Sequence, residues 1–155
     1  MTNETTVDTP REITIAFDGA CLGNHGPGGY AAILINTRTD REKIVRGRET
    51  ATTNNKMELS AAIAGLNALS PGAVVNMLGD SQYVIKGFTE WLPGWKAKGW
   101  RGANKKPVAN VDLWQALEMA VARHLSVSWT WVRRHAGHDL NERVNQIASA
   151  EAAMA

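Results

Sequence analysis

The chain has 155 residues, of which 44% are hydrophobic and 21% are charged, and its formal net charge is +2. These values are typical of one globular domain and exclude a largely disordered chain. No apolar run approaches the roughly 20 residues that span a bilayer, which excludes a transmembrane helix. Cys21 is the only cysteine, so an internal disulfide and a cysteine-rich zinc site are excluded, and we expect a cytoplasmic protein.

The first half of the chain predicts a tail, three strands and a helix. Residues 1–11 are polar and contain Pro10, which favours a disordered tail, and residues 12–155 are predicted to form a single domain. Alternating or β-branched residues predict strands in REITIAF, GYAAILIN and KIVRGRET, and short connections favour antiparallel neighbours. TTNNKMELSAAIAGLNALSPG then predicts a helix with an Asn or Thr cap and a Pro-Gly stop.

The second half alternates between strands and helices. A short buried strand is predicted in AVVNMLGDSQYV. Because a helix precedes it, we expect this strand to run parallel to a strand of the first sheet. Short helices are predicted in SQYVIKGF and from TEW onward, a longer one in NVDLWQALEMAVARH, a fifth strand in SVSWTWV, and a last helix from about Leu140 to Ala153. The fold class is therefore α/β, with a five-stranded mixed sheet flanked by helices.

Three acidic residues lie where surface acids are not expected. Asp18 follows the apolar segment ITIAF, and Asp80 follows VVNML. A turn residue is the structural alternative for Asp18, and a helix N-cap is the alternative for Asp80. Glu58 falls on the helical stripe that should face the core, shared with Ala61, Ala62, Gly65, Leu66 and Leu69.

A metal site would account for all three acids. A buried carboxylate is disfavoured unless a cation neutralises it or its pKa rises until it is protonated. Asp18 and Asp80 fall at the carboxyl ends of two predicted strands, where ligands collect in open α/β sheets. Three carboxylates with open coordination positions suit Mg²⁺, which prefers oxygen ligands and keeps several waters.

Five segments in order closely resemble the bacterial type 1 ribonuclease H family over about Ile13 to Ala153. Four are its active-site motifs, FDGACLGNHGPGGY, TTNNKMEL, GDSQYV and HAGHDLNERVNQIA. The fifth, WKAKGWRGANKKPVANVDLW, is similar to the family's basic protrusion. The resemblance implies a ribonuclease H-like fold and a metal-dependent endonuclease that cuts the RNA strand of RNA/DNA hybrids, leaving 5′-phosphate and 3′-hydroxyl ends.

The resemblance also implies the metal ligands. Asp18, Glu58 and Asp80 match the first three catalytic carboxylates, and two Mg²⁺ ions are expected, with Mn²⁺ as a possible substitute. Asn145 stands at the fourth carboxylate position. Its side chain offers a carbonyl oxygen without charge, so we expect weaker metal binding there and altered but retained activity. Solvent exposure is the structural alternative, and the sequence leaves open whether this asparagine is natural or a laboratory substitution.

Further site residues follow from the resemblance. His135 matches the family's mobile histidine, which is proposed to shuttle a proton or assist product release. Residues expected to contact the hybrid include a phosphate-pocket threonine and small polar groups near the RNA: Cys21, Asn24, Thr53, Asn54 and Gln82. Loop and cap chemistry is the structural alternative for this group.

The basic segment is expected to contact the nucleic acid backbone. Lys96, Lys98, Arg101, Lys105 and Lys106 occur there without an acid among them. The substrate-binding set expected here is Trp91, Trp95, Lys96, Lys98, Trp100 and Arg101, with the tryptophans able to pack inside while the cations point to phosphates. A solvated basic face is the alternative, and Trp114, Trp129 and Trp131 are expected to be mainly core.

Two other classes of protein remain possible at this point. One is a catalytically impaired hybrid-binding module, owing to Asn145. The other is a related fold member that acts on DNA, such as a resolvase or transposase core. The expected partner is the RNA/DNA hybrid, with no membrane and a monomeric state.

Overall fold

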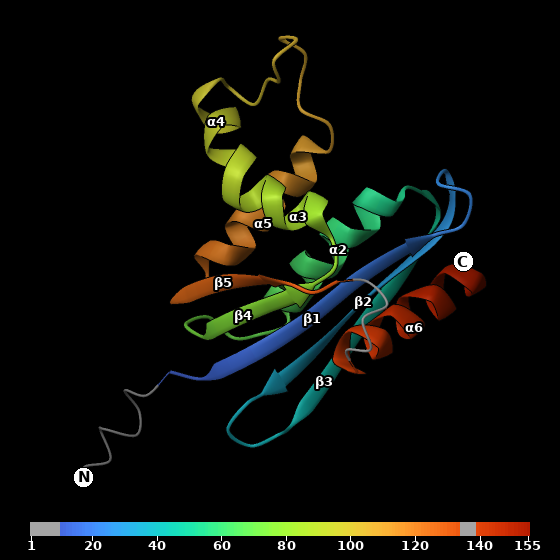
Figure 1. The fold of residues 1–155 in the computed structure, drawn as a ribbon, viewed down its shortest axis with the longest axis vertical. Coiled ribbons are helices and arrows are strands. Elements are labelled where there is room, and N and C mark those ends of the chain that lie inside the picture. Colours follow the sequence, from blue (N-terminus) through green and yellow to red (C-terminus); the bar gives the residue numbers. More distant parts are fainter. Residues whose placement is uncertain (1–9, 134–138) are drawn as a thin grey trace.

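Three antiparallel strands, β1 (Glu12–Cys21), β2 (Gly26–Asn36) and β3 (Glu42–Thr52), form one half of a five-stranded sheet. The shorter strands β4 (Val74–Gly79) and β5 (Ser126–Trp131) complete the sheet in the order β3-β2-β1-β4-β5, and β4 runs parallel to both β1 and β5 (Figure 1). The structure is a computed structural model that describes residues 10–133 and 139–155. All five predicted strands and their directions are confirmed.

The helices lie on both faces of this sheet. One side carries α2 (Asn54–Asn67), α3 (Gln82–Lys86), the π-helix η1 (Gly87–Trp91), α4 (Leu92–Ala97) and α5 (Val111–Ala122), while α6 (Asp139–Met154) lies across β1, β2 and β3 on the other (Figure 1). Within the described residues, no helix is both long and apolar enough to cross a membrane.

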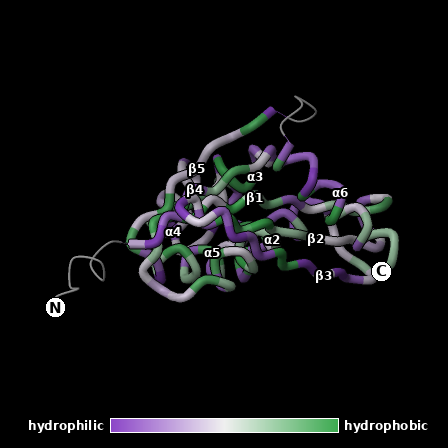
Figure 2. The backbone as a smooth tube through the Cα atoms, turned by 90° about the horizontal axis from the view of Figure 1, so that it is seen from below, coloured by the Kyte–Doolittle hydropathy of each residue, from purple (hydrophilic) through white to green (hydrophobic). Residues whose placement is uncertain are grey.

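Two hydrophobic clusters hold these layers together. The larger one lies between the sheet and α2 and α5, with Phe17, Leu59 and Trp114 among its fully buried side chains. The smaller one packs Val144 and Ala148 of α6 on the opposite sheet face. Strand β3 forms one edge of the sheet and is mostly exposed, which agrees with its hydrophilic colour in Figure 2.

Trp131 does not belong to this core. Its side chain is 44% exposed, so the expectation that it is mainly core is wrong, whereas Trp114 is fully buried and Trp129 packs edge-on against Phe17. Trp129 and Trp131 point to the same side of β5, but Trp131 is the last residue of the edge strand. Fewer core side chains therefore cover the Trp131 ring.

The predicted tail is described only from Pro10. Arg11 donates hydrogen bonds to the carbonyl oxygens of Ser70 and Pro71, at 2.7 and 2.9 Å, and its own carbonyl accepts from the Val74 amide at 2.8 Å. Arg11 is thus anchored to the turn before β4, which corrects the tail boundary at residue 11. The rest of the predicted tail, residues 1–9, lies outside the described residues.

Gly29 sets the distance between β2 and α6. A Cβ atom at this position would lie 2.4 Å from the Ala148 carbonyl oxygen and 2.5 Å from the Ala152 amide nitrogen. We expect Gly29→Ala to lower the free energy of unfolding by about 1–3 kcal/mol, the usual cost of overpacking, because helix backbone cannot move aside cheaply. Urea denaturation would measure this change.

Gly94→Ala provides the matched control. A Cβ atom there would have no neighbour within 4 Å, and the residue lies inside α4, where alanine is the better helix former. An equal loss of stability in both variants would show that the close packing of α6 on Gly29 does not limit stability.

Candidate metal-dependent active site

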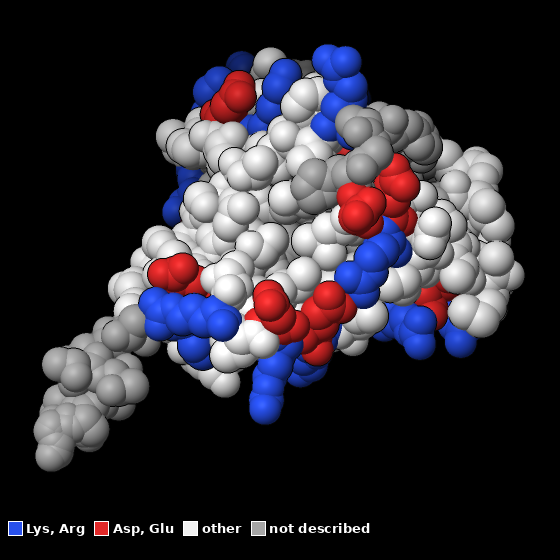
Figure 3. Space-filling view, turned by 60° about the horizontal axis from the view of Figure 1, so that its bottom comes forward, with Lys and Arg blue, Asp and Glu red and all other residues white. Residues whose placement is uncertain are grey.

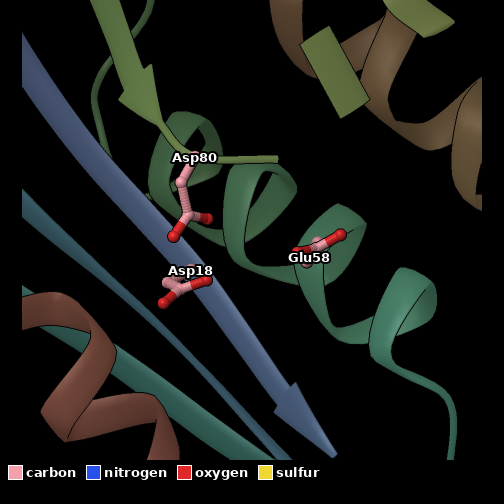
Figure 4. A group of neighbouring side chains, drawn as sticks. All are labelled: Asp18, Glu58 and Asp80. Carbon is pink, nitrogen blue, oxygen red and sulfur yellow. The ribbon is translucent and has the colours of Figure 1, made fainter. Parts of the chain in front are cut away.

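Three carboxylates from distant parts of the chain meet beside β1. Asp18 lies on β1, Glu58 on the first half of α2, and Asp80 directly after β4. One carboxylate oxygen from each residue can be chosen so that all three lie within 4.8 Å of one another. Figure 4 shows the Asp80 side chain extending from the end of β4 toward Asp18 on β1, with Glu58 on the neighbouring helix α2.

The parallel pairing of β1 with β4 brings the two aspartates together. The register pairs Ala16 with Leu78, and Asp18 and Asp80 each follow two residues later. β4 ends before Asp80, as expected, but β1 continues through Asp18 to Cys21 because its antiparallel pairing with β2 goes on. The expectation that Asp18 ends its strand is therefore wrong.

Gly19 allows α2 to bring Glu58 close to Asp18. A Cβ atom at Gly19 would lie 2.4 Å from the backbone nitrogen of Glu58 and 2.4 Å from the carbonyl carbon of Met57. Any larger residue would push the beginning of α2 away from β1. The predicted stripe is confirmed for Glu58, Ala61, Ala62, Gly65 and Leu66, which are all buried, whereas Leu69 lies beyond the end of α2 and is half-buried.

Burial makes this group of acids unfavourable without a cation. Asp18 is 3% exposed and Glu58 is 8% exposed. Burial raises the pKa of Glu58 from its ordinary 4.5 to about 7, and the negative charges of Asp18 and Asp80 add to this rise, while the hydrogen bond from Ser81 opposes it. A divalent cation prefers carboxylate oxygens and would remove the repulsion. The residues present therefore fit a metal site.

Ser81 is a site residue that the sequence reasoning missed. Its hydroxyl donates a 2.8 Å hydrogen bond to Glu58 Oε1 and accepts one from the Val84 amide at 3.1 Å. Ser81, not Asp80, is thus the N-cap of α3, so the alternative role for Asp80 is wrong. The strong N-cap preference of serine was the signal that could have identified it.

The backbone around the site supplies two more hydrogen bonds. The Gly19 amide donates to Asp18 Oδ1 at 2.9 Å, but Asp18 lies inside β1, so the alternative of a turn residue is wrong. The indole Nε1 of Trp131 donates to the Asp80 carbonyl oxygen at 3.2 Å. Each of these bonds holds a carboxylate-bearing segment in place.

Asn145 lies at the same site although it is 127 residues from Asp18 in the sequence. Its Nδ2 donates a 2.8 Å hydrogen bond to Asp18 Oδ2 from the part of α6 that faces β1. The side chain is partly buried, so the alternative of simple solvent exposure is wrong. His135, the other residue expected near the site, lies outside the described residues.

Four of the five predicted RNA- or DNA-contacting residues line one hollow of about 740 Å³ beside the β1–β2 turn. They are Cys21, Asn24, Thr53 and Asn54, and the hollow is completed by His25, Asn55, Lys56, Ala109 and Asn110. Thr53 also caps α2 through the Lys56 amide, and Asn24 accepts a hydrogen bond from the Asn54 amide at 2.9 Å. Gln82 is exposed and lines a separate hollow on α3.

The predicted basic segment forms α4 and the loop after it. Lys96, Lys98 and Arg101 are exposed, but Lys96 pairs with Glu118 of α5 at 2.5 Å, which the sequence did not indicate. Trp95 and Trp100 pack against the core, with the Trp95 ring centroid 5.3 Å from that of Trp114. Trp91 is 42% exposed, so the expected inward packing holds for two of these three tryptophans.

The chain is similar to known proteins over most of its length. The family model described as RNase H matches residues 10–153. Ribonuclease HI of Caulobacter vibrioides is 54% identical over 91% of this chain and 92% of its own length. Ribonuclease H of Phenylobacterium zucineum is 56% identical over 88% of each chain.

Solved structures agree with this comparison. The crystal structure of LC9-RNase H1, described as a type 1 RNase H with the type 2 active-site motif, matches with a TM-score of 0.84 and 33% identity, covering 94% of this chain and 74% of that one. The predicted fold class, with three antiparallel strands followed by parallel ones and flanking helices, is confirmed.

Proposed function

Since this chain belongs to the ribonuclease H family, we propose that it hydrolyses the RNA strand of RNA/DNA hybrids at the site built from Asp18, Glu58, Asp80 and Asn145. The observation that carries this proposal is the convergence of three carboxylates within 4.8 Å, with the Asn145 amide bonded to the first of them. Family membership implies dependence on a divalent metal, and the buried acids are the ligands that such an ion needs.

Four side chains would divide the metal binding between them. Asp18 would contribute to two Mg²⁺ positions, Glu58 and Asp80 would complete one, and the Asn145 carbonyl oxygen would complete the other, with Mn²⁺ able to substitute. When bound, the two ions would activate the attacking water and stabilise the leaving oxygen, leaving a 5′-phosphate and a 3′-hydroxyl. The Asn145 amide now presents nitrogen to Asp18, so the side chain must turn to offer its oxygen to an ion.

Selection of the RNA strand is assigned to the hollow beside the site. Discrimination against DNA requires polar groups that reach 2′-hydroxyls, and Asn24, Asn54 and the backbone at Cys21 are available there. Thr53 and Lys56 would hold a phosphate of the DNA strand. Gln82 would contact the RNA from α3, and His135 would transfer a proton or help the product leave.

The test is cleavage of a labelled RNA/DNA hybrid compared with double-stranded DNA of the same sequence. We expect cleavage of the RNA strand only, with either Mg²⁺ or Mn²⁺, and none with a chelator. Lack of turnover with both metals would overturn the proposal, and cleavage of the DNA duplex would favour the DNA-acting alternative. The catalytically impaired binding module has no support in the comparisons. Monomeric state and cytoplasmic location stay predictions.

Asn145→Asp is expected to lower the Mg²⁺ concentration at half-maximal activity by about tenfold. Two unit charges 4 Å apart attract by about 4 kcal/mol at an effective dielectric constant of 20. About a third of that free energy already lowers the dissociation constant of the metal by a factor of ten. Magnesium titrations of hybrid cleavage would measure it. Gln146→Glu adds the same charge to the next, exposed position of α6 and should leave the titration unchanged; an equal shift in both variants would argue against Asn145 as a ligand.

Lys98 and Arg101 are expected to bind the nucleic acid backbone more strongly than Lys96, because Glu118 already neutralises Lys96. Replacing Lys98 by glutamine should make the slope of log binding constant against log salt concentration less steep. The expected change is about 0.9 for each phosphate contact that is lost, which is the value for B-DNA. Fluorescence anisotropy at several salt concentrations would measure the slope. Lys43→Gln, on β3 at the opposite end of the molecule from α4 (Figure 1), is the control and should leave the slope unchanged.

A further inference from the structure

A second hollow of about 200 Å³ opens on the outer side of α3 and η1. It is lined by Gln82, Ile85, Lys86, Glu90 and Trp131, and shares none of these with the three-carboxylate site. The four helical residues recur every three or four positions, so they form one stripe facing the end of β5. This hollow is smaller than the roughly 300–1,000 Å³ of pockets that enclose a drug-sized ligand, so it suits a single flat ring system.

Trp131 presents its ring to this hollow in a fixed orientation. The indole is 44% exposed, although tryptophan is normally well buried. Its Nε1 is nevertheless bonded to the Asp80 carbonyl oxygen, and the Val132 amide next to it donates to the Gly79 carbonyl oxygen at 2.9 Å. The ring edge is therefore anchored while a large part of the ring surface remains open to solvent.

The chemistry of the walls is that of a nucleobase site. Trp131 and Ile85 supply apolar surface for stacking, while Gln82 and Glu90 can exchange hydrogen bonds with the polar edge of a base. Lys86 is exposed and can pair with a phosphate. The hollow also adjoins the proposed catalytic site, since one hydrogen bond links Trp131 to Asp80.

Charge within the hollow is compatible with this ligand. Elsewhere, on the face of the molecule in Figure 3, lysine and arginine side chains lie among acidic ones. Within the hollow, the one lysine and the one glutamate leave no net charge. The base would therefore be recognised by stacking and by hydrogen bonds to its polar edge, and Lys86 would pair with its phosphate.

We propose that Trp131 is a stacking site for one unpaired nucleobase of the RNA strand that flanks the hybrid held in the active site. This inference rests on the proposed function, because the hybrid is what brings the strand to Asp80. An unpaired base is required, because neighbours cover both faces of a base pair inside the duplex and the hollow has room for a single ring system, not for a base pair at the duplex end. The enzyme would then bind hybrids that end in a short single-stranded RNA extension more tightly than blunt ones.

The experiment compares dissociation constants for blunt hybrids and for hybrids with one to three unpaired RNA nucleotides at either the 5′ or the 3′ end. Binding is measured with a chelator so that no cleavage occurs. We expect about tenfold tighter binding for one of the two extensions, in the range of one base–aromatic stack. A 2-aminopurine in that extension should lose fluorescence on binding. Equal affinity for blunt and both extended hybrids would overturn the proposal.

Variants of Trp131 separate stacking from the hydrogen bond to Asp80. Trp131→Phe removes the N–H group but keeps an aromatic face, so it should retain most of the preference for the extension. Trp131→Leu should abolish the preference, measured as the ratio of the two dissociation constants within each variant. Equal loss in both variants would overturn the stacking role, as would an unchanged ratio in Trp131→Leu.

Two further measurements complete the design. Leu125→Gln changes a residue that is 66% exposed and outside the hollow, and should keep the wild-type ratio. If Trp131→Leu fails to fold, the 2-aminopurine signal in the unaltered protein still decides the question. Failure of the unaltered protein to cleave a blunt hybrid would contradict the proposed function, whereas the preference for an extension is read from binding alone, so the two failures are distinguishable.

Discussion

Replacing Asp18 by asparagine is expected to reduce hybrid cleavage by on the order of a thousandfold. An oxygen of this carboxylate lies within 4.8 Å of one of Asp80, which extends toward it in Figure 4, and Asn145 donates a 2.8 Å hydrogen bond to it. Its loss would weaken both proposed metal positions together. Metal ions contribute several kcal/mol of transition-state stabilisation, and each 1.36 kcal/mol is a factor of ten in rate. Single-turnover cleavage with saturating Mg²⁺ would measure the effect.

The thousandfold loss should not come from unfolding. Asp18→Asn removes one of the negative charges that raise the pKa of Glu58, so the metal-free variant should be at least as stable as the parent in urea denaturation. Asp40→Asn is the matched control, because Asp40 is exposed in the β2–β3 turn at φ 60°, a conformation that asparagine also tolerates. Near-normal cleavage by Asp18→Asn would remove this residue from the proposed mechanism.

The stability of the metal-free protein is expected to fall as the pH rises from about 4.5 to 7. Glu58 has its pKa raised from 4.5 to about 7 by burial, so the folded protein binds this proton more tightly than the unfolded chain. The stabilisation is fully present below pH 4.5 and is lost as the pH passes 7. At about 1.4 kcal/mol per pKa unit, the whole effect is about 3 kcal/mol. Urea denaturation at several pH values with a chelator would measure it.

Glu58→Gln and Mg²⁺ provide the two controls for this pH effect. Glutamine has about the same shape and does not titrate, so the variant should lack this fall in stability. Mg²⁺ should restore the parent's stability at pH 7 and above, because ion binding favours the deprotonated carboxylate. If stability falls equally with rising pH in the parent and in Glu58→Gln, other groups cause the pH dependence.

Much of the fold was predictable because its strands and helices have strong local patterns. The β-branched or alternating segments became β1 to β5, and the capped segment after Thr53 became α2. The errors occurred where local patterns do not contain the deciding contact. Asp18 was placed at a strand end because the apolar run stops there, but pairing with β2 carries β1 on to Cys21.

The same reason explains the wrong N-cap alternative for Asp80, the wrong expectation for Trp131, and the partner of Lys96 that the sequence did not indicate. Asp80 and Ser81 are both good N-cap residues, and only the position of Glu58 shows why serine takes this role and aspartate is left for the site. Trp131 continues an alternating pattern whose earlier member Trp129 is packed on Phe17 and Phe88, but the sheet edge leaves it exposed. The partner of Lys96 lies 22 residues away on α5.

By itself, the sequence determined the α/β class, the order of the elements and the identity of the three acids, because periodicity and residue type act over a few neighbouring positions. The tertiary structure alone decided that Asn145 donates to Asp18, that Ser81 holds Glu58, and that Trp131 stays open beside Asp80. Those contacts depend on parallel strand register and on the approach of α2 and α6 to Gly19 and Gly29. Both are set by packing between segments far apart in the chain.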